Sequence, residues 1–295
     1  MKSATALLFL GWLIVSPAWS QDRPAPAIDG YVAGAASTGT SPASDVQRCA
    51  EIAGAGPQYS ALGRACEYAL SGKNLPNYIC SETADRSMNS KPLDVVTAEV
   101  AFIRGNGDHY SNLTIDGRPV DTLCCHAGWN LGALFGTELN TIFLPGTQTE
   151  FKFKRIAKSH AGPEAIYDFE FKAENNRTWS IDRLIRSEDN RTWISHHFYA
   201  GFSGSIAVAE ESGELQRMEA TSTSPDPGMQ LISYTISVEY QETSIPDLGS
   251  ALIPSLATLK ACLTGGTCFE NREVFHECRE FASKARVLPG FQSVP

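Results

Sequence analysis

The chain has 295 residues and a formal net charge of −9, with 24 lysines and arginines against 33 aspartates and glutamates. Nucleic-acid binding depends on clustered Lys and Arg, so this acidic balance disfavours a nucleic-acid partner. Hydrophobic residues make up 42% of the chain and charged residues 19%, which is enough apolar material for a packed core and excludes disorder of the whole chain.

The first twenty residues have the layout of a secretory signal peptide. Lys2 precedes an apolar stretch over 4–15, and Ala18 and Ser20 supply the small residues expected before a cleavage site. The alternative is an N-terminal membrane anchor, but the apolar stretch is short for a span. We therefore expect residues 1–20 to be removed near Ser20. The mature chain should then be periplasmic or extracellular, with no transmembrane span.

Two short segments follow the predicted cleavage site. Residues 21–44 are rich in Pro, Ala, Gly and Ser and have no periodic apolar pattern, which predicts a flexible leader. Residues 45–74 form a predicted helical segment that is interrupted at 54–57 and ends at Gly72.

Beyond residue 75 the apolar period changes from that of a helix to that of strands. One helix is expected over 129–143, ending before Pro145. The expected strands begin around residue 78 and 151, and the others cover 95–103, 110–115, 165–171, 178–181, 197–208, 215–221, 231–240, 250–259 and 269–281.

About ten strands and two or three helices predict a mainly β (α+β) fold. We expect an antiparallel sheet, wrapped or curved, with helices held against one face. No linker is evident after residue 75, so residues 75–287 are treated as one domain and 288–295 as a tail.

All eight cysteines lie beyond the predicted cleavage site, and an even number in an exported chain indicates disulfides. Cys262 and Cys268 bracket a hairpin tip, and we expect them to pair. Cys49 and Cys66 flank the bend in the helical segment and are expected to tie two short helices together. Adjacent cysteines seldom bond each other, so Cys124 and Cys125 are each expected to reach a different partner. The sequence leaves open the pairing of these two and of Cys80 and Cys278.

No group of residues has the spacing of a catalytic or metal site. Cys124-Cys125-His126 resembles a fragment of a zinc site, but no second cysteine pair has zinc spacing, so no metal is expected. His196 and His197 would point to opposite faces of a strand. An enzyme that uses either histidine is the least favoured of three hypotheses. The segment 201–206 lacks the spacing of a nucleophile elbow, and no cofactor fingerprint is present.

A local basic strip crosses this acidic chain at Lys152, Lys154, Arg155 and Lys158. An amphipathic strand is the simplest interpretation, because Phe151, Phe153 and Ile156 lie between the charges. The alternative is a docking surface for an acidic partner. Asn112, Asn176 and Asn190 begin glycosylation sequons, which suggests that these stretches lie near the surface.

The order of segments resembles that of a group of uncharacterised exported bacterial proteins. These are similar to distant members of the lipoprotein-carrier superfamily, which is LolA-like and includes the regulator RseB. The resemblance covers about residues 75–285 and rests on the segments 75–80 (LPNYIC), 94–100 (DVVTAEV), 110–114, 132–143, 150–152, 167–169, 201–206 (GFSGSI) and 217–220 (RMEA).

The resemblance implies a half-barrel: a curved antiparallel sheet whose concave face is covered by short helices. In the carriers the concave side holds acyl chains, and the family has no catalytic residues to carry over. The eight cysteines and the N-terminal helical segment depart from that pattern. Both put a mobile cover in doubt, because disulfides could lock the helices in place.

The expected function is that of an exported, non-enzymatic binding protein with an apolar concave site for a lipid, an acyl chain or a lipoprotein. The alternative is an envelope sensor or protein-interaction module whose cavity is only core. Enclosed apolar spaces under curved sheets are common ligand sites. The residues expected to line the site are Val100, Phe102, Leu131, Leu134, Phe135, Phe153, Phe169 and Tyr199.

Overall fold

The computed structural model describes residues 42–70, 78–103, 107–123, 128–131, 137–159, 162–186, 193–223, 227–245 and 249–280. The helices are α1 (Pro42–Gly54), α2 (Ser60–Leu70) and α3 (Thr137–Phe143), and the 3-10 turns are η1 (Pro57–Tyr59), η2 (Pro145–Thr147), η3 (Ala173–Asn175) and η4 (Pro227–Met229). The strands are β1 (Tyr78–Met88), β2 (Lys91–Ile103), β3 (Gly107–Ile115), β4 (Arg118–Pro119), β5 (Glu150–Ser159), β6 (Gly162–Phe171), β7 (Ser180–Arg186), β8 (Trp193–Tyr199), β9 (Phe202–Ala209), β10 (Leu215–Ser222), β11 (Leu231–Ile245), β12 (Gly249–Leu263) and β13 (Cys268–Glu280).

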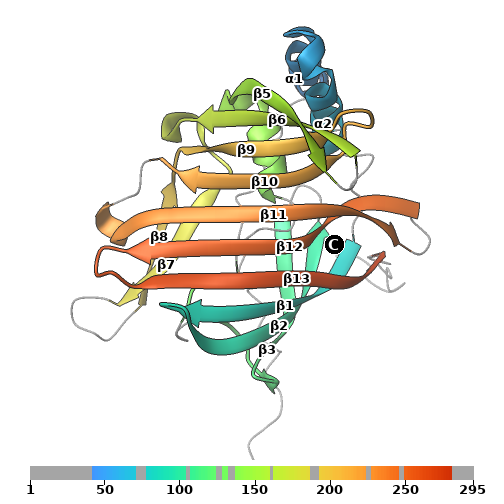
Figure 1. Ribbon diagram of the computed structural model, residues 1–295. Coiled ribbons are helices and arrows are strands. Elements are labelled where there is room, and N and C mark those ends of the chain that lie inside the picture. The colour runs from blue at the N-terminus through green and yellow to red at the C-terminus, as the bar shows by residue number, and fades with distance from the viewer. Residues whose placement is uncertain are drawn as a thin grey trace, which may run out of the picture.

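Eleven of the strands form one antiparallel sheet in the order β4-β3-β2-β1-β13-β12-β11-β10-β9-β6-β5. The two ends of this order are different strands, so the sheet is open rather than closed into a barrel (Figure 1). Strands β7 and β8 form a separate two-stranded ribbon. The mainly β fold with a large antiparallel sheet and few short helices is therefore confirmed.

The first and last of the described strands lie side by side in the middle of the sheet. Strand β1 pairs with β13 along most of its length, with Ala84 opposite Glu273. A disulfide joins Cys80 to Cys278 across this pair and closes a loop of 198 residues. In the chain-entropy account a loop of that length contributes about 5 kcal/mol of stability. The disulfide thus cross-links the first described strand to the last one.

The two faces of the sheet differ because side chains alternate along each strand. In β6, Tyr167, Phe169 and Phe171 are buried, whereas Asp168 and Glu170 between them are not. The apolar face must be covered by other elements, and the polar face can meet water.

Helices α1 and α2, with the turn η1 between them, form a helical hairpin. This hairpin covers one end of the apolar face, beside β5 and β6 in Figure 1. Cys49 of α1 is bonded to Cys66 of α2, which confirms the disulfide-tied helical segment. The helices approach closely at Gly63, where a Cβ atom would lie 2.5 Å from the Cβ of Ala53. None of the described helices combines the length and the apolar character that a membrane span requires.

The predicted single strand over 197–208 is wrong, because the chain forms two strands there. Strand β8 ends at Tyr199 in the ribbon, and β9 begins at Phe202 in the large sheet. The break lies at Gly201, whose Cβ would lie 2.7 Å from the Thr223 hydroxyl oxygen and 3.0 Å from the Phe171 carbonyl oxygen. Only glycine fits this crossing, and the alternation of apolar residues runs through it unchanged.

The predicted helix over 129–143 is also wrong in its first part. Helix α3 covers residues 137–143, whereas Trp129–Leu131 is not helical. The carbonyl oxygens of Trp129 and Asn130 accept hydrogen bonds from the Arg86 guanidinium (3.1 Å) and the Asn271 amide (3.0 Å). Side chains of the sheet therefore hold this segment in place of helical hydrogen bonds. Residues 132–136 lie outside the described residues.

Gly204 should be intolerant of any side chain. A Cβ atom there would lie 1.9 Å from the carbonyl oxygen of Glu219 on the neighbouring strand, so β9 and β10 would have to separate. We expect Gly204→Ala to lower the free energy of unfolding by about 3 kcal/mol. Gly265→Ala is the matched control, because nothing lies within 4 Å of its added methyl group. Equal unfolding midpoints in urea for the two variants would contradict this account of the sheet.

Candidate functional site

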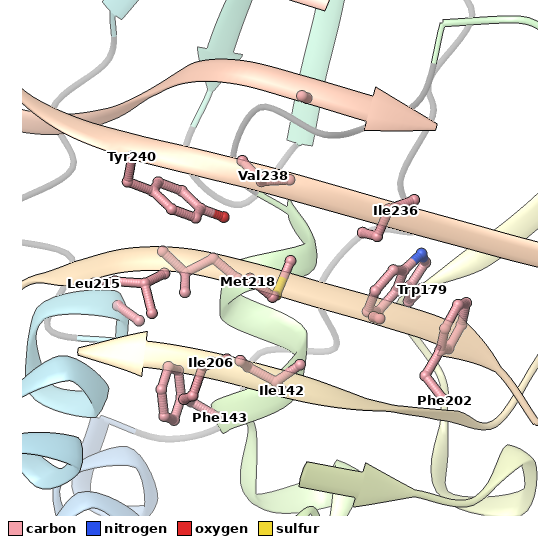
Figure 2. Close-up of a cluster of buried hydrophobic side chains, with 14 of the residues drawn as sticks. Ile142, Phe143, Trp179, Phe202, Ile206, Leu215, Met218, Ile236, Val238 and Tyr240 are labelled. Atoms are coloured by element: carbon pink, nitrogen blue, oxygen red, sulfur yellow. The ribbon is translucent and has the colours of Figure 1, made fainter. Parts of the chain in front are cut away.

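The apolar face of the sheet carries a close-packed cluster under α3 (Figure 2). Ile142 and Phe143 of α3 are fully buried and point toward the sheet. The sheet side of the cluster comes from β9 (Phe202, Ile206), β10 (Leu215, Met218) and β11 (Ile236, Val238, Tyr240). In this part of the molecule side chains fill the space between helix and sheet.

Aromatic rings extend the cluster toward the ribbon. Trp179 stacks on Phe202, with ring centroids 3.9 Å apart and ring planes 12° apart. Phe171 lies against both rings at centroid distances of 6.0 and 5.6 Å. Sequence reasoning missed Trp179, Phe202 and Met218 as central residues. The alternation of Met218 and Ala220 with charged Arg217 and Glu219 could have placed Met218 on the apolar face.

The residues expected to line the concave site fall in several places. Val100, Leu131 and Phe169 are buried members of one apolar cluster, and Phe153 packs against it from β5. Tyr199 lies on β8 in the ribbon, with its ring edge-on to His197 at 4.7 Å. Leu134, Phe135 and the side chain of Phe102 lie outside the described residues.

One region of the same face, where β1 pairs with β13, carries buried polar side chains. Glu82, Arg86, Asn271 and Glu273 are all buried there. Arg86 makes a two-pronged ion pair with Asp94, and both hydrogen bonds are 2.7 Å long. Its remaining terminal nitrogen donates to the Trp129 carbonyl oxygen. The inner face therefore combines an apolar region under α3 with a polar region at β1 and β13 that anchors residues 128–131.

Apolar packing and hydrogen bonds between side chains and backbone groups fix the helical hairpin to the sheet. The Arg64 guanidinium donates to the Glu210 carbonyl oxygen at 2.7 Å, and the Tyr68 hydroxyl accepts from the Leu252 N–H at 2.7 Å. The Tyr167 hydroxyl of β6 donates to the Gln58 carbonyl oxygen at 2.7 Å. These bonds hold the hairpin to the sheet without any covalent link.

The three described disulfides leave the covering elements free of covalent attachment to the sheet. Cys49–Cys66 lies within the helical hairpin, while Cys80–Cys278 and Cys262–Cys268 lie within the sheet. Cys124 and Cys125 lie outside the described residues. Since the other six cysteines pair with one another, the prediction that each of these two reaches a different cysteine of the chain is wrong.

Asn176 contradicts the expectation that its sequon lies near the surface, because the residue is fully buried. Its amide nitrogen donates to the carbonyl oxygens of Trp179 and Ala200, both at 2.7 Å. Its amide oxygen accepts from the N–H groups of Thr178 (3.2 Å) and Trp179 (3.0 Å). One side chain thus sets the turn that presents Trp179 to the cluster.

We expect Asn176→Ala to be strongly destabilising, because it leaves two carbonyl oxygens and two N–H groups without partners. The loss should be roughly 3 kcal/mol or more. That corresponds to a fall of about 6–12 °C in the unfolding temperature for a domain of this size. Asn175→Ala is the control, since that amide makes an exposed bond to Gln148. Similar melting temperatures for the two variants would rule out the structural role given to Asn176.

Burial raises the pKa of Tyr167 from 10.0 to about 12. The unfolded chain loses this proton near pH 10, so the folded state retains it more strongly. Stability from this group is fully present below pH 10 and is lost as the pH rises toward 12. Wild type should therefore lose more stability between pH 10 and 12 than Tyr167→Phe does, measured by urea unfolding at several pH values. Parallel losses would exclude this linkage. Tyr199→Phe is the control.

The histidine pair has a defined geometry on the ribbon. His197 lies opposite Asp182 and His196 opposite Arg183. The Nδ1 atom of His197 lies 2.5 Å from Asp182 Oδ1, and the Ser180 hydroxyl donates to the other oxygen of Asp182 at 2.9 Å. The serine thus bonds to the carboxylate and not to the imidazole, which is not the nucleophile–base contact of a hydrolase. In the described part of the chain, no three His, Cys, Asp or Glu side chains form a metal-binding group.

A shallow open groove of about 630 Å³ lies over β5, β6, β9 and β10. Ser203, Gly204 and Ser205 contribute to it from β9. Charged side chains such as Lys154 and Asp168, which form an exposed ion pair at 2.9 Å, line its β5–β6 side. Residues 202–206, in the segment that lacks the spacing of a nucleophile elbow, belong to strand β9, and Ser203 and Ser205 line this polar groove.

No protein-family model and no curated protein matches this sequence. A solved structure of a LolA superfamily protein from Nitrosomonas europaea aligns with 83% of this chain and 95% of its own chain. The sequence identity is 11% and the TM-score is 0.36. A likeness of that extent carries no argument about ligand or mechanism, which must come from the residues themselves.

Proposed function

We propose that this protein is an exported, non-enzymatic binding protein that takes a lipid or the acyl chain of a lipoprotein against the apolar face of its sheet. The observation that carries the proposal is the cover of that face. Helix α3 is only seven residues long, and no described disulfide joins it to the sheet. A ligand would take the place of α3.

Few contacts would have to be exchanged. Leu139, Ile142 and Phe143 are the buried apolar residues of α3. Exposing three such side chains costs about 5–9 kcal/mol, and burying an acyl chain of about 14 methylenes gains about 11 kcal/mol. The Thr178 hydroxyl donates to Thr141 at 3.0 Å, and the Thr147 hydroxyl donates to the Thr141 carbonyl oxygen at 2.8 Å. The free-energy cost of exposing these α3 side chains and the gain from burying the acyl chain are close enough for reversible exchange.

Export is part of the proposal. It is supported by the signal-peptide layout of residues 1–20 and by the disulfides, which persist in oxidising compartments. The same disulfides would keep the sheet rigid while its cover moves. The absence of a nucleophile–base contact on the ribbon supports a binding role over an enzymatic one.

The test is native mass spectrometry of the full chain purified from an oxidising compartment, followed by organic extraction. We expect excess mass that extracts as a lipid. Protein stripped of ligand should also bind cis-parinaric acid with a rise in fluorescence. A bare polypeptide mass together with no fluorescence change would overturn the proposal. The interior would then be core alone, and the alternative of an envelope interaction module would stand.

A matched pair of variants locates the ligand. Met218→Gln places an amide of similar size in the middle of the apolar face, and Arg217→Gln makes the neighbouring change on the exposed face. We expect Met218→Gln to weaken parinaric acid binding about tenfold or more, because the amide has no partner beside an acyl chain. Arg217→Gln should bind as wild type does. Unchanged binding by a folded Met218→Gln protein would place the ligand elsewhere.

A further inference from the structure

The two edges of the open sheet are protected to different degrees. Strand β4 at one edge is two residues long and ends in Pro119, which has no N–H to offer. Strand β5 at the other edge is ten residues long and lies at the upper margin of the sheet in Figure 1. Among the described residues no further strand pairs with β5 on its outer side. A long unpaired edge is a ready template for another chain.

The molecule closes the first half of this edge with its own side chain. The Phe153 N–H donates to the Tyr59 hydroxyl at 3.1 Å, and that hydroxyl donates to the Phe151 carbonyl oxygen at 3.4 Å. The outward backbone groups of two alternate residues thus meet one tyrosine. The Thr149 carbonyl oxygen, just before the strand, accepts from the Arg48 guanidinium at 2.5 Å.

In the second half of the edge, no described residue hydrogen-bonds to the outward backbone groups of Ile156 and Lys158. Lys158 lies opposite Pro163, whose carbonyl oxygen accepts from the Glu210 N–H on the far side of β6. Backbone groups alternate in direction along an antiparallel pair, so those of Lys158, and of Ile156 two residues earlier, point away from β6. Both side chains are exposed, and Ile156 retains 45% of its accessible surface. Four outward backbone groups therefore accompany an exposed apolar side chain.

We propose that residues 155–159 bind an extended acidic segment of a partner protein, which adds a strand to β5. Main-chain hydrogen bonds to Ile156 and Lys158 would give the affinity, and side chains would give the selectivity. Arg155 and Lys158 carry positive charge at this edge, and Lys152 and Lys154 precede them on the strand. The same charges oppose pairing with the β5 edge of a second copy. The inference does not depend on lipid binding.

The facing directions define the partner more closely. Ile156 pairs with the buried Ala165, so it lies on the inner face at the rim of the core, and Lys158 shares that face. Arg155 lies opposite Ile166 and points to the other face. An antiparallel partner should then place an apolar residue against Ile156. Acidic residues should stand against Lys158 and Arg155.

The experiment uses the full chain and the peptide acetyl-Thr-Glu-Thr-Val-Glu-Thr-amide, with a version that carries Lys in place of both Glu as the control peptide. Isothermal titration calorimetry at low salt should give a Kd below about 1 mM for the acidic peptide only. Lys158→Pro removes one outward N–H without touching the pairing with β6, and it should weaken binding about tenfold or more. Combined Arg155→Glu and Lys158→Glu should reverse the preference between the two peptides.

Lys152→Glu makes the same change of charge in the first half of β5, where Tyr59 occupies the outward backbone groups. It should therefore alter the affinity for the acidic peptide less than Lys158→Glu does. Thermal unfolding checks that Lys158→Pro is folded; if it is not, the charge reversal decides. Three outcomes would overturn the proposal. These are no binding of the acidic peptide at about 1 mM, equal binding by wild type and both edge variants, or a self-association of the protein that Lys158→Pro abolishes.

Discussion

An open sheet cannot shield its own apolar face from water. In this protein that constraint determines where the helices and the other covering segments pack. A barrel would enclose the face, but the order of eleven strands ends in two different edges. The chain therefore covers the face with separate pieces: a helical hairpin, the short helix α3, the segment 128–131 and the indole of Trp179. Each piece buries only a few side chains, so the contacts that complete the core are also those that any ligand of this face must replace.

Covalent and noncovalent bonds are distributed unevenly between the sheet and the elements that cover its apolar face. Two described disulfides lie in the sheet and one lies within the helical hairpin, while hydrogen bonds and packing join hairpin to sheet. The segment 128–131 is also held without a covalent bond to the sheet, because buried Arg86 and Asn271 donate hydrogen bonds to its carbonyl oxygens. The disulfides thus stabilise the sheet against unfolding. The elements that cover it are held by noncovalent interactions, which can exchange.

Local periodicity predicted the strands well, because each strand with one wet face repeats every second residue. It failed where tertiary contacts decide the backbone. Nothing in the alternation of 197–208 reveals that Gly201 must cross close to Thr223, and nothing in 129–131 reveals that Arg86 and Asn271 claim its carbonyl oxygens. The same limit applies to Asn176. Its glycosylation sequon suggests a surface position, but the side chain is buried and hydrogen-bonded to four backbone groups.

Tyr59 contacts both the buried core under the helical hairpin and the backbone of the edge strand β5. Its hydroxyl closes the backbone groups of Phe151 and Phe153, and its ring packs on Tyr167 with centroids 5.8 Å apart. The turn that carries it is also held by the bond from Tyr167 to Gln58. A displacement of this turn would therefore remove cover from the core and uncap the first half of β5 in one movement. The open groups of Ile156 and Lys158 would then be joined by those of Phe151 and Phe153. An occupant of the apolar face that moved the turn and a partner on the edge would therefore favour each other. Such coupling is reciprocal, because each would stabilise the same displaced state.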